Sequence, residues 1–369
     1  MFEFGKGIFG QEEALKSLYN IYTSGRIPHA FLFSGNEGIG KYFSAIHFTQ
    51  LLNSTSGNPN TSTKIQKLQE PYLKLIFPLP RGKNETGDEG PLDKFDENQI
   101  AEVYSEIAAK SINPYHQIQI TKATSIKISS IREIKKFLSL NYSELIYRVI
   151  IILDAHLMNE ESQNSLLKSL EEPPEGTIFI IITHKKEYLL PTIISRCSEV
   201  KFSPLSKNDM TTILLEYFNL ENNHAEILSN FADGSVTKAL KLAKYQIDSL
   251  EDDIINIISN SSMNKYDSAK LLLENFKEIY GDDSFDLVLD LINKFLIDSL
   301  KLRVNKNSHV YFNNRKERII KFNSVMKNAQ TETVINSIEK LRTSLRYNIN
   351  LNLFLTNIIL ELSVLNKRQ

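Results

Sequence analysis

Short apolar runs alternate with helical stretches through the first half of the chain. The runs cover positions 31–33, 73–77, 148–153, 177–182 and 199–202. Most of them are continuously apolar, which indicates strands that are covered on both faces. Because helical segments separate the runs, the strands are expected to lie parallel to one another. The pattern therefore predicts an α/β fold built around a parallel sheet.

The second half of the chain has a different pattern. After Ser206 the strand signals stop, and apolar residues recur at three- and four-residue spacing. This spacing predicts helices, most clearly over 207–218, 287–304, 331–347 and 351–365. We expect this half to be all-helical.

A polar segment at 53–115 interrupts the first half. It contains clusters of Ser, Asn, Pro and Gly, and it includes an acidic stretch with Glu85, Asp88, Glu89, Asp93, Asp96 and Glu97. Such clusters usually mark solvated connections between elements. We therefore interpret the segment as a partly mobile insertion, a loop in preference to a binding surface.

Composition narrows the class of protein. With 369 residues, 41% of them hydrophobic, the chain can bury a sizeable core and form two or three domains. A net charge of -1 argues against a protein that coats nucleic acid, so any DNA contact is expected on one face only. Cys197 is the single cysteine, which excludes an internal disulfide and a thiolate zinc site. No apolar run suits a membrane span or a secretory signal, so we expect a cytoplasmic protein.

A candidate phosphate-binding loop follows the first predicted strand. Gly35, Gly38 and Gly40 belong to the string GNEGIGK, which ends at Lys41 and precedes a helical stretch. Glycines at these positions let backbone N–H groups close around phosphate oxygens, and the lysine can reach the outer phosphates. The string alone is a weak signal, and its place between a strand and a helix strengthens it. The loop is compatible with bound ATP or ADP.

Positions around this loop depart from what ATP hydrolysis requires. Tyr42 stands where a serine or threonine hydroxyl would bind Mg²⁺. Asp154 supplies the aspartate expected after its strand, but Ala155 replaces the carboxylate that would orient the attacking water. His156 is a single histidine at a strand end with no second ligand expected nearby, so we interpret it as structural and expect no metal site. Bound nucleotide is expected to persist without turnover.

Several strings together carry a family resemblance. They are SLLKSLEEPP at 165–174, IIIT at 180–183, SRC at 195–197, FGQ at 9–11, PHA at 28–30, ISSIRE at 128–133 and NINL at 348–351. In this order and spacing the chain resembles the bacterial clamp-loader family over nearly its whole length. The resemblance is weakest in the insertion and between about residues 250 and 331.

The resemblance implies a subunit in three parts. These are an AAA+ P-loop core at 1–203 that contains the insertion at 53–115, a small helical lid at 204–247, and a helical collar at 248–369. It also implies a five-subunit ring with gamma/tau ATPase subunits and a delta subunit, which loads the sliding clamp onto primed DNA. The implied nucleotide-binding residues are Gly35, Gly38, Gly40, Lys41, Asp154 and Thr183. The four zinc-binding cysteines usual in the family are absent, so no zinc is expected.

Arg196 of the SRC triplet is implied to reach into the ATP site of the neighbouring subunit, where a guanidinium stabilises charge on the γ-phosphate. The lid position of a phosphate-sensing arginine holds Thr237, and Lys238 points roughly 100° away from it on a helix. Tyr42, Ala155 and Thr237 each replace a residue that ATP hydrolysis needs, and this combination matches the non-hydrolysing, delta-prime type of subunit. The alternatives are an ATP-hydrolysing gamma/tau type and an unrelated P-loop enzyme such as a nucleotide kinase.

The most basic region lies between positions 301 and 327. Its basic residues are Lys301, Arg303, Lys306, Arg315, Lys316, Arg318, Lys321 and Lys327, against the single acidic Glu317. Such a region can face DNA phosphates, but charged runs on helices are more often solvated. We favour the solvated interpretation.

Overall fold

Five parallel strands form the predicted sheet. A computed structural model describes residues 3–56, 60–82, 89–139, 146–245, 247–281, 284–345 and 350–366. The strands are β1 (Ala30–Ser34), β2 (Leu73–Ile76), β3 (Arg148–Ile152), β4 (Thr177–Thr183) and β5 (Ser198–Lys201). They pair in the order β2-β3-β4-β1-β5, and every pair is parallel. The predicted α/β class and all five strand positions are confirmed.

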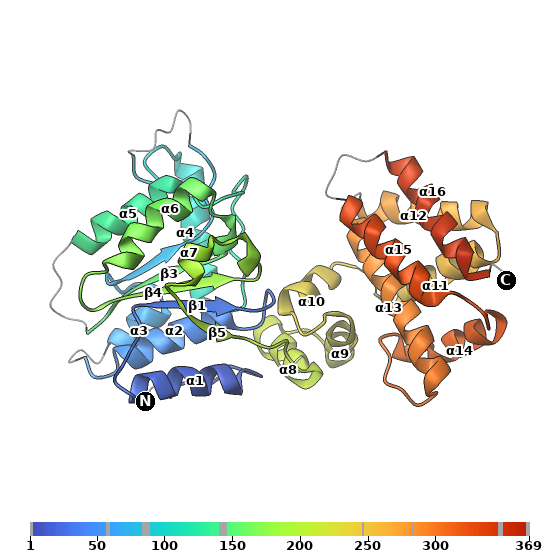
Figure 1. Cartoon of the computed structure of the whole chain (residues 1–369), viewed down its shortest axis with the longest axis horizontal. Helices are drawn as coiled ribbons and strands as arrows, with labels where there is room; N and C mark the ends of the chain where they lie inside the picture. The colour runs from blue at the N-terminus through green and yellow to red at the C-terminus, as the bar shows by residue number, and fades with distance from the viewer. Residues whose placement is uncertain are drawn as a thin grey trace. The chain divides into compact units, whose positions relative to one another are not determined.

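Helices cover both faces of this sheet (Figure 1). On one side lie α1 (Glu12–Thr23), α2 (Lys41–Leu52) and α3 (Thr61–Gln66), and on the other α5 (Ile128–Ser139), α6 (Glu160–Glu171) and α7 (Pro191–Ile194). Alternate strand residues face the two layers. Leu32 and Ile181 join the core beneath α5 and α6, whereas Phe31 meets Phe48 of α2 with ring centroids 5.2 Å apart. Burial on both faces explains why the three inner strands, β3, β4 and β1, are almost continuously apolar.

The polar segment at 53–115 contains more structure than expected. Besides α3 and β2 it forms α4 (Glu97–Ile112), a helix of 16 residues. Asp96 accepts a hydrogen bond from the backbone nitrogen of Gln99, and the Gln99 side chain bonds the backbone of Asp96 in return. This capping box satisfies donors at the start of the helix. The loop interpretation is therefore wrong for α4, while Glu85 and Asp88 lie outside the described residues.

The chain divides into two compact units, residues 1–239 and 240–369. The first unit also holds α8 (Lys207–Phe218), α9 (Asn222–Phe231) and the start of α10 (Val236–Leu242). The second unit holds α11 (Ile247–Ser262), α12 (Tyr266–Tyr280), α13 (Phe285–Val304), α14 (Lys316–Val325), α15 (Thr331–Ser344) and α16 (Leu351–Ser363). In the described residues after Lys201 every element is helical, as predicted. The finer division into core, lid and collar stays a prediction.

In the basic region of the second unit, arginine side chains form hydrogen bonds that link neighbouring helices and loops. The Asp252 carboxylate of α11 accepts a hydrogen bond from Arg315 at 2.8 Å and another from Arg318. Arg303 donates to the backbone oxygen of Met326 at 2.9 Å. These contacts give the arginines a structural role and leave the exposed lysines of the region, such as Lys306 and Lys321, to solvent or to a partner.

Two further predictions from the sequence are the NINL string before the last helix and the absence of a membrane-spanning segment. Asn348 and Ile349, from the string at 348–351, lie outside the described residues, whereas Asn350 caps α16 by accepting from the backbone nitrogen of Leu353. Across the described ranges, no helix combines the length and the apolarity that a bilayer crossing would require.

Candidate functional site

The predicted site residues meet where three neighbouring strands end. Ser34 of β1 pairs with Thr183 of β4, and Ile152 of β3 pairs with Ile181 of β4. The carboxyl ends of parallel strands share one edge of a sheet, so the loop after β1 and the residues after β3 and β4 are neighbours. This register brings Asp154 to the candidate phosphate loop.

The phosphate loop has the glycine-dependent backbone that its sequence predicts. Gly35, Gly38 and Gly40 have φ values of 135°, 68° and 93°, a region that side-chain-bearing residues rarely adopt. The space is also restricted, because a Cβ at Gly38 would lie 2.5 Å from the backbone nitrogen of Thr237. Helix α2 begins at Lys41, directly after the loop.

The loop is joined to the start of α10. The backbone nitrogen of Val236 donates to the Gly38 oxygen at 3.0 Å, and the Ser235 hydroxyl donates to the Glu37 oxygen at 2.7 Å. Thr237, which occupies the predicted sensor position, accepts a hydrogen bond from Gln117 at 2.8 Å. The sensor position therefore holds a short neutral side chain that is already hydrogen-bonded.

The ammonium group of Lys41 turns back onto its own loop. Its Nζ donates to the backbone oxygen of Gly35 at 2.7 Å and to that of Asn36. Burial lowers the pKa of Lys41 to about 8, although Asp154 and Glu37 oppose this shift. To contact a phosphate, Lys41 would exchange these two carbonyl oxygens for phosphate oxygens.

Tyr42 is buried under a lysine that sequence reasoning did not single out. Lys110 of α4 places its Nζ 4.3 Å from the centroid of the Tyr42 ring, a cation–π contact. The same ammonium donates to the backbone oxygens of Pro114, at 2.9 Å, and His116. Burial lowers the pKa of Lys110 to about 7 and raises that of Tyr42 well above its usual value. A buried ring and a second lysine thus lie beside Lys41, where a metal-binding hydroxyl was expected.

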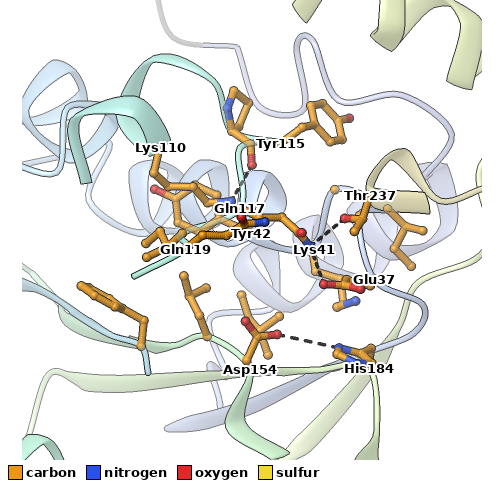
Figure 2. Close-up of a pocket in the computed structure, with 18 of the residues that line it drawn as sticks. Glu37, Lys41, Tyr42, Lys110, Tyr115, Gln117, Gln119, Asp154, His184 and Thr237 are labelled. Atoms are coloured by element: carbon orange, nitrogen blue, oxygen red, sulfur yellow. Dashed lines mark hydrogen bonds and ion pairs between the residues drawn. The ribbon is translucent and has the colours of Figure 1, made fainter. Parts of the chain in front are cut away.

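Lys41, Tyr42 and Lys110 line a pocket of about 280 Å³. In Figure 2, Asp154 and His184 at the strand ends face Lys110, Tyr42 and Gln117 across it. Ala155, by contrast, is fully buried and does not line the pocket. The position next to Asp154 therefore presents no side chain to a ligand.

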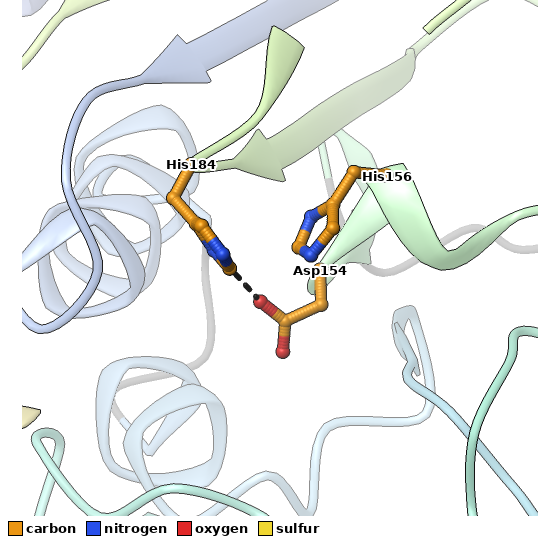
Figure 3. Close-up of side chains that lie close together, drawn as sticks. All are labelled: Asp154, His156 and His184. Atoms are coloured by element: carbon orange, nitrogen blue, oxygen red, sulfur yellow. Dashed lines mark ion pairs between the residues drawn. The ribbon is translucent and has the colours of Figure 1, made fainter. Parts of the chain in front are cut away.

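Asp154 lies beside two histidines (Figure 3). It has a left-handed backbone, φ 48° and ψ 45°, and its Oδ1 lies 3.8 Å from Nδ1 of His184. The His156 and His184 rings pack edge to face with centroids 4.2 Å apart. The expectation that His156 has no second ligand nearby is therefore wrong, because β4 ends directly before His184.

The surroundings of Asp154 and His156 lower the pKa values of both residues. Burial lowers the pKa of His156 to about 4, and the neighbouring His184 adds to this effect. Burial alone would raise the pKa of Asp154, but the nearby His184 and the charge of His156 bring it below the usual range. Thr183 is fully buried behind the pocket, where its hydroxyl meets Nδ1 of His156 at 3.2 Å.

Arg196 lies away from this pocket, between α7 and β5. Its Nη2 donates to Oε1 of Glu171, at the end of α6, at 2.6 Å, and its side chain is 35% exposed. The following residue, Cys197, is largely covered, and burial raises its thiol pKa to about 12. Arg196 is thus accessible to a partner, and Cys197 is not a reactive thiol.

Comparison with known proteins agrees with the sequence motifs. Residues 10–206, more than half of the chain, match the family described as DNA polymerase III, delta subunit. The chain is 28% identical over 263 residues to DNA polymerase III subunit gamma of Buchnera aphidicola subsp. Schizaphis graminum, a match that covers 70% of this chain and 62% of that protein. It is 26% identical over 240 residues to DNA polymerase III subunit delta' of Bacillus subtilis, covering 63% of this chain and 59% of that protein.

Among solved structures, a DNA polymerase III gamma subunit-related protein from Thermotoga maritima matches 95% of this chain and 99% of its own. The sequence identity is 16% and the TM-score is 0.40. The chain spans less than two thirds of the length of the gamma and delta' relatives that it resembles in sequence.

Proposed function

The chain belongs to the DNA polymerase III delta-subunit family, and from this premise we propose that it is the non-hydrolysing, delta-prime type of clamp-loader subunit. In this proposal it joins gamma/tau ATPase subunits and a delta subunit in a ring of five. The ring loads the sliding clamp onto primed DNA. This chain contributes Arg196 to the ATP site of the neighbouring ATPase subunit.

The observation that carries the proposal is the packing around Tyr42. In an active P-loop ATPase, a small hydroxyl after the lysine binds Mg²⁺. Here the ring of Tyr42 and the ammonium of Lys110, 4.3 Å from its centroid, occupy the region beside Lys41. The Tyr42 ring replaces that small hydroxyl, and its phenolic oxygen lies at the far end of a buried aromatic side chain. Together with the buried Ala155, this packing favours a silent subunit over an ATP-hydrolysing gamma/tau type.

Nucleotide binding is a separate part of the proposal. The positive φ values of Gly35, Gly38 and Gly40 and the adjacent Lys41 fit a phosphate group. Asp154 is on the pocket wall, and Thr183 supports that wall from behind. The residue after Lys41 does not fit a phosphate-bound Mg²⁺. We therefore expect ATP or ADP to bind without being hydrolysed.

Arg196 is the residue through which this subunit would contribute to ATP hydrolysis in a neighbouring subunit. An arginine inserted from a neighbouring subunit stabilises the charge that develops on the transferred phosphoryl group, an effect of about 10³- to 10⁵-fold in rate. The side chain of Arg196 is 35% exposed and is held by the exposed carboxylate of Glu171 and by the backbone oxygen of Thr192, to which its Nη1 donates at 2.9 Å. Exchange of that carboxylate for a phosphate of a neighbour would require only a local rotation of side chains.

ATP turnover by the purified chain alone separates the two subunit types. The silent type predicts no turnover above that of a Lys41→Ala variant, with or without primed DNA. Binding of a fluorescent ATP analogue, measured on the same two proteins, reports whether the loop is occupied. Turnover that is abolished by Lys41→Ala would overturn the silent assignment and favour the gamma/tau type.

A further inference from the structure

A carboxylate and two imidazoles converge at one edge of the pocket. One carboxylate oxygen of Asp154 and one ring nitrogen each of His156 and His184 lie within 4.8 Å of one another. In the sequence these residues follow two different strands, β3 and β4. Metal–ligand distances near 2.0–2.2 Å place ligand atoms somewhat closer together than this, so a small contraction of side chains would complete a shared site.

The backbone and a supporting hydroxyl orient this group. The left-handed conformation of Asp154, φ 48°, directs its carboxylate toward His184. The Thr183 hydroxyl accepts a hydrogen bond from the backbone nitrogen of Lys185 at 3.0 Å and meets Nδ1 of His156 at 3.2 Å. If Nδ1 of His156 carries the proton, its Nε2 is free to bind a cation. Such outer hydrogen bonds are typical of histidines that bind metals.

We propose that Asp154, His156 and His184 form a binding site for a transition-metal dication of the Zn²⁺ class. Two imidazoles and one carboxylate are a ligand set for zinc and its neighbours, whereas Mg²⁺ prefers oxygen ligands. The proposal does not depend on a role in clamp loading.

The site would be open on one side. Asp154 and His184 both line the pocket, so the remaining coordination positions face its interior. Three protein ligands with an open fourth position are common in zinc sites that bind water or a ligand oxygen. In this pocket the added ligand would be water or a phosphate oxygen held near Lys41.

Zinc titration of the untagged full chain tests the proposal. The protein is stripped with a chelator, dialysed, and titrated with Zn²⁺ by calorimetry; Co²⁺ then serves as a spectroscopic substitute. We expect one Zn²⁺ per chain, visible d–d bands for Co²⁺ that report nitrogen ligands, and no displacement by excess Mg²⁺. Binding of less than one Zn²⁺ at the affinity of exposed histidines would overturn the proposal.

Variants locate the site. His184→Ala is expected to weaken zinc binding by at least about 100-fold, because loss of an outer hydrogen bond alone costs roughly 10- to 100-fold. Thr183→Val should cause that smaller loss while keeping all three ligands. His309→Ala, at an exposed histidine in the second unit, is the matched control and should bind zinc as wild type does. Equal affinity in His184→Ala and His309→Ala would place the zinc elsewhere and reject the site.

Discussion

Nη2 of Arg196 donates to Oε1 of Glu171 at 2.6 Å, so the guanidinium proposed to serve a neighbour is held within its own chain. The two side chains are 35% and 47% exposed. Exposed ion pairs contribute about 0–1 kcal/mol to stability. A contact this weak orients Arg196 without preventing its transfer to a more highly charged partner.

Substitution of Glu171 should therefore have little effect on folding. We expect Glu171→Ala to change the free energy of unfolding by less than about 1 kcal/mol, as measured by urea denaturation. In a reconstituted loader it should not lower DNA-stimulated ATPase, because Arg196 keeps its own side chain. A loss of ATPase as large as that of Arg196→Ala would mean that Glu171 is needed to position the arginine.

Lys110 should give the protein a pH-dependent stability. Burial lowers its pKa from about 10.5 to about 7, so between these values the unfolded chain binds a proton that the folded chain has lost. Stability therefore rises with pH in this window. The difference in unfolding free energy, wild type minus Lys110→Met, should increase from pH 7 to pH 9 by up to about 1.4 kcal/mol per pH unit. A constant difference would show that Lys110 has an ordinary pKa.

Gly25 and Gly38 have nearly the same backbone φ but different surroundings. Substituting each by alanine therefore distinguishes the cost of backbone strain from the cost of steric crowding. Gly25 and Gly38 have φ values of 69° and 68°, but a Cβ at Gly25 meets nothing within 4 Å, whereas one at Gly38 meets Thr237 at 2.5 Å. Gly25→Ala should cost about 1–2 kcal/mol for the left-handed backbone alone. Gly38→Ala should cost clearly more, because the phosphate loop must also separate from α10. Equal melting temperatures would contradict this packing.

The missing carboxylate cannot simply be restored. Ala155 is fully buried, so Ala155→Glu would place a charge in a packed interior. We expect a loss of about 3 kcal/mol or more in the free energy of unfolding and no gain of ATP turnover. Ala101→Glu, on the exposed face of α4, is the control and should stay within about 0.5 kcal/mol of wild type. An ATPase gained by Ala155→Glu would show that the site is closer to activity than we propose.

The pattern of the chain predicted the sheet well, because strands buried on both faces leave continuous apolar runs such as 148–153 and 177–182. It did not predict the partners of Asp154. His184 stands 30 positions further along the chain, and only the pairing of β3 with β4 brings it to the same edge. Two polar residues that follow neighbouring strands are the signal that could have indicated this contact.

Lys110 was missed for a different reason. The polar composition of 53–115 concealed α4, although Asp96 and Gln99 have capping-box spacing and Ile100, Val103 and Ile107 follow a helical period. Composition averaged over a long segment thus outweighed a local pattern. The contact of Lys110 with Tyr42 depends on tertiary packing and has no signature in either local sequence.

Reconstitution of the loader with Arg196→Ala tests the central claim most directly. Wild type and variant are each assembled with gamma/tau ATPase subunits, a delta subunit, the sliding clamp and primed DNA, with Arg26→Ala as a control at an exposed arginine. We predict that Arg196→Ala assembles normally but loses the DNA-stimulated ATP turnover of the adjoining site, and that Arg196→Lys does not restore it. Unchanged ATPase in a fully assembled Arg196→Ala complex would contradict the account.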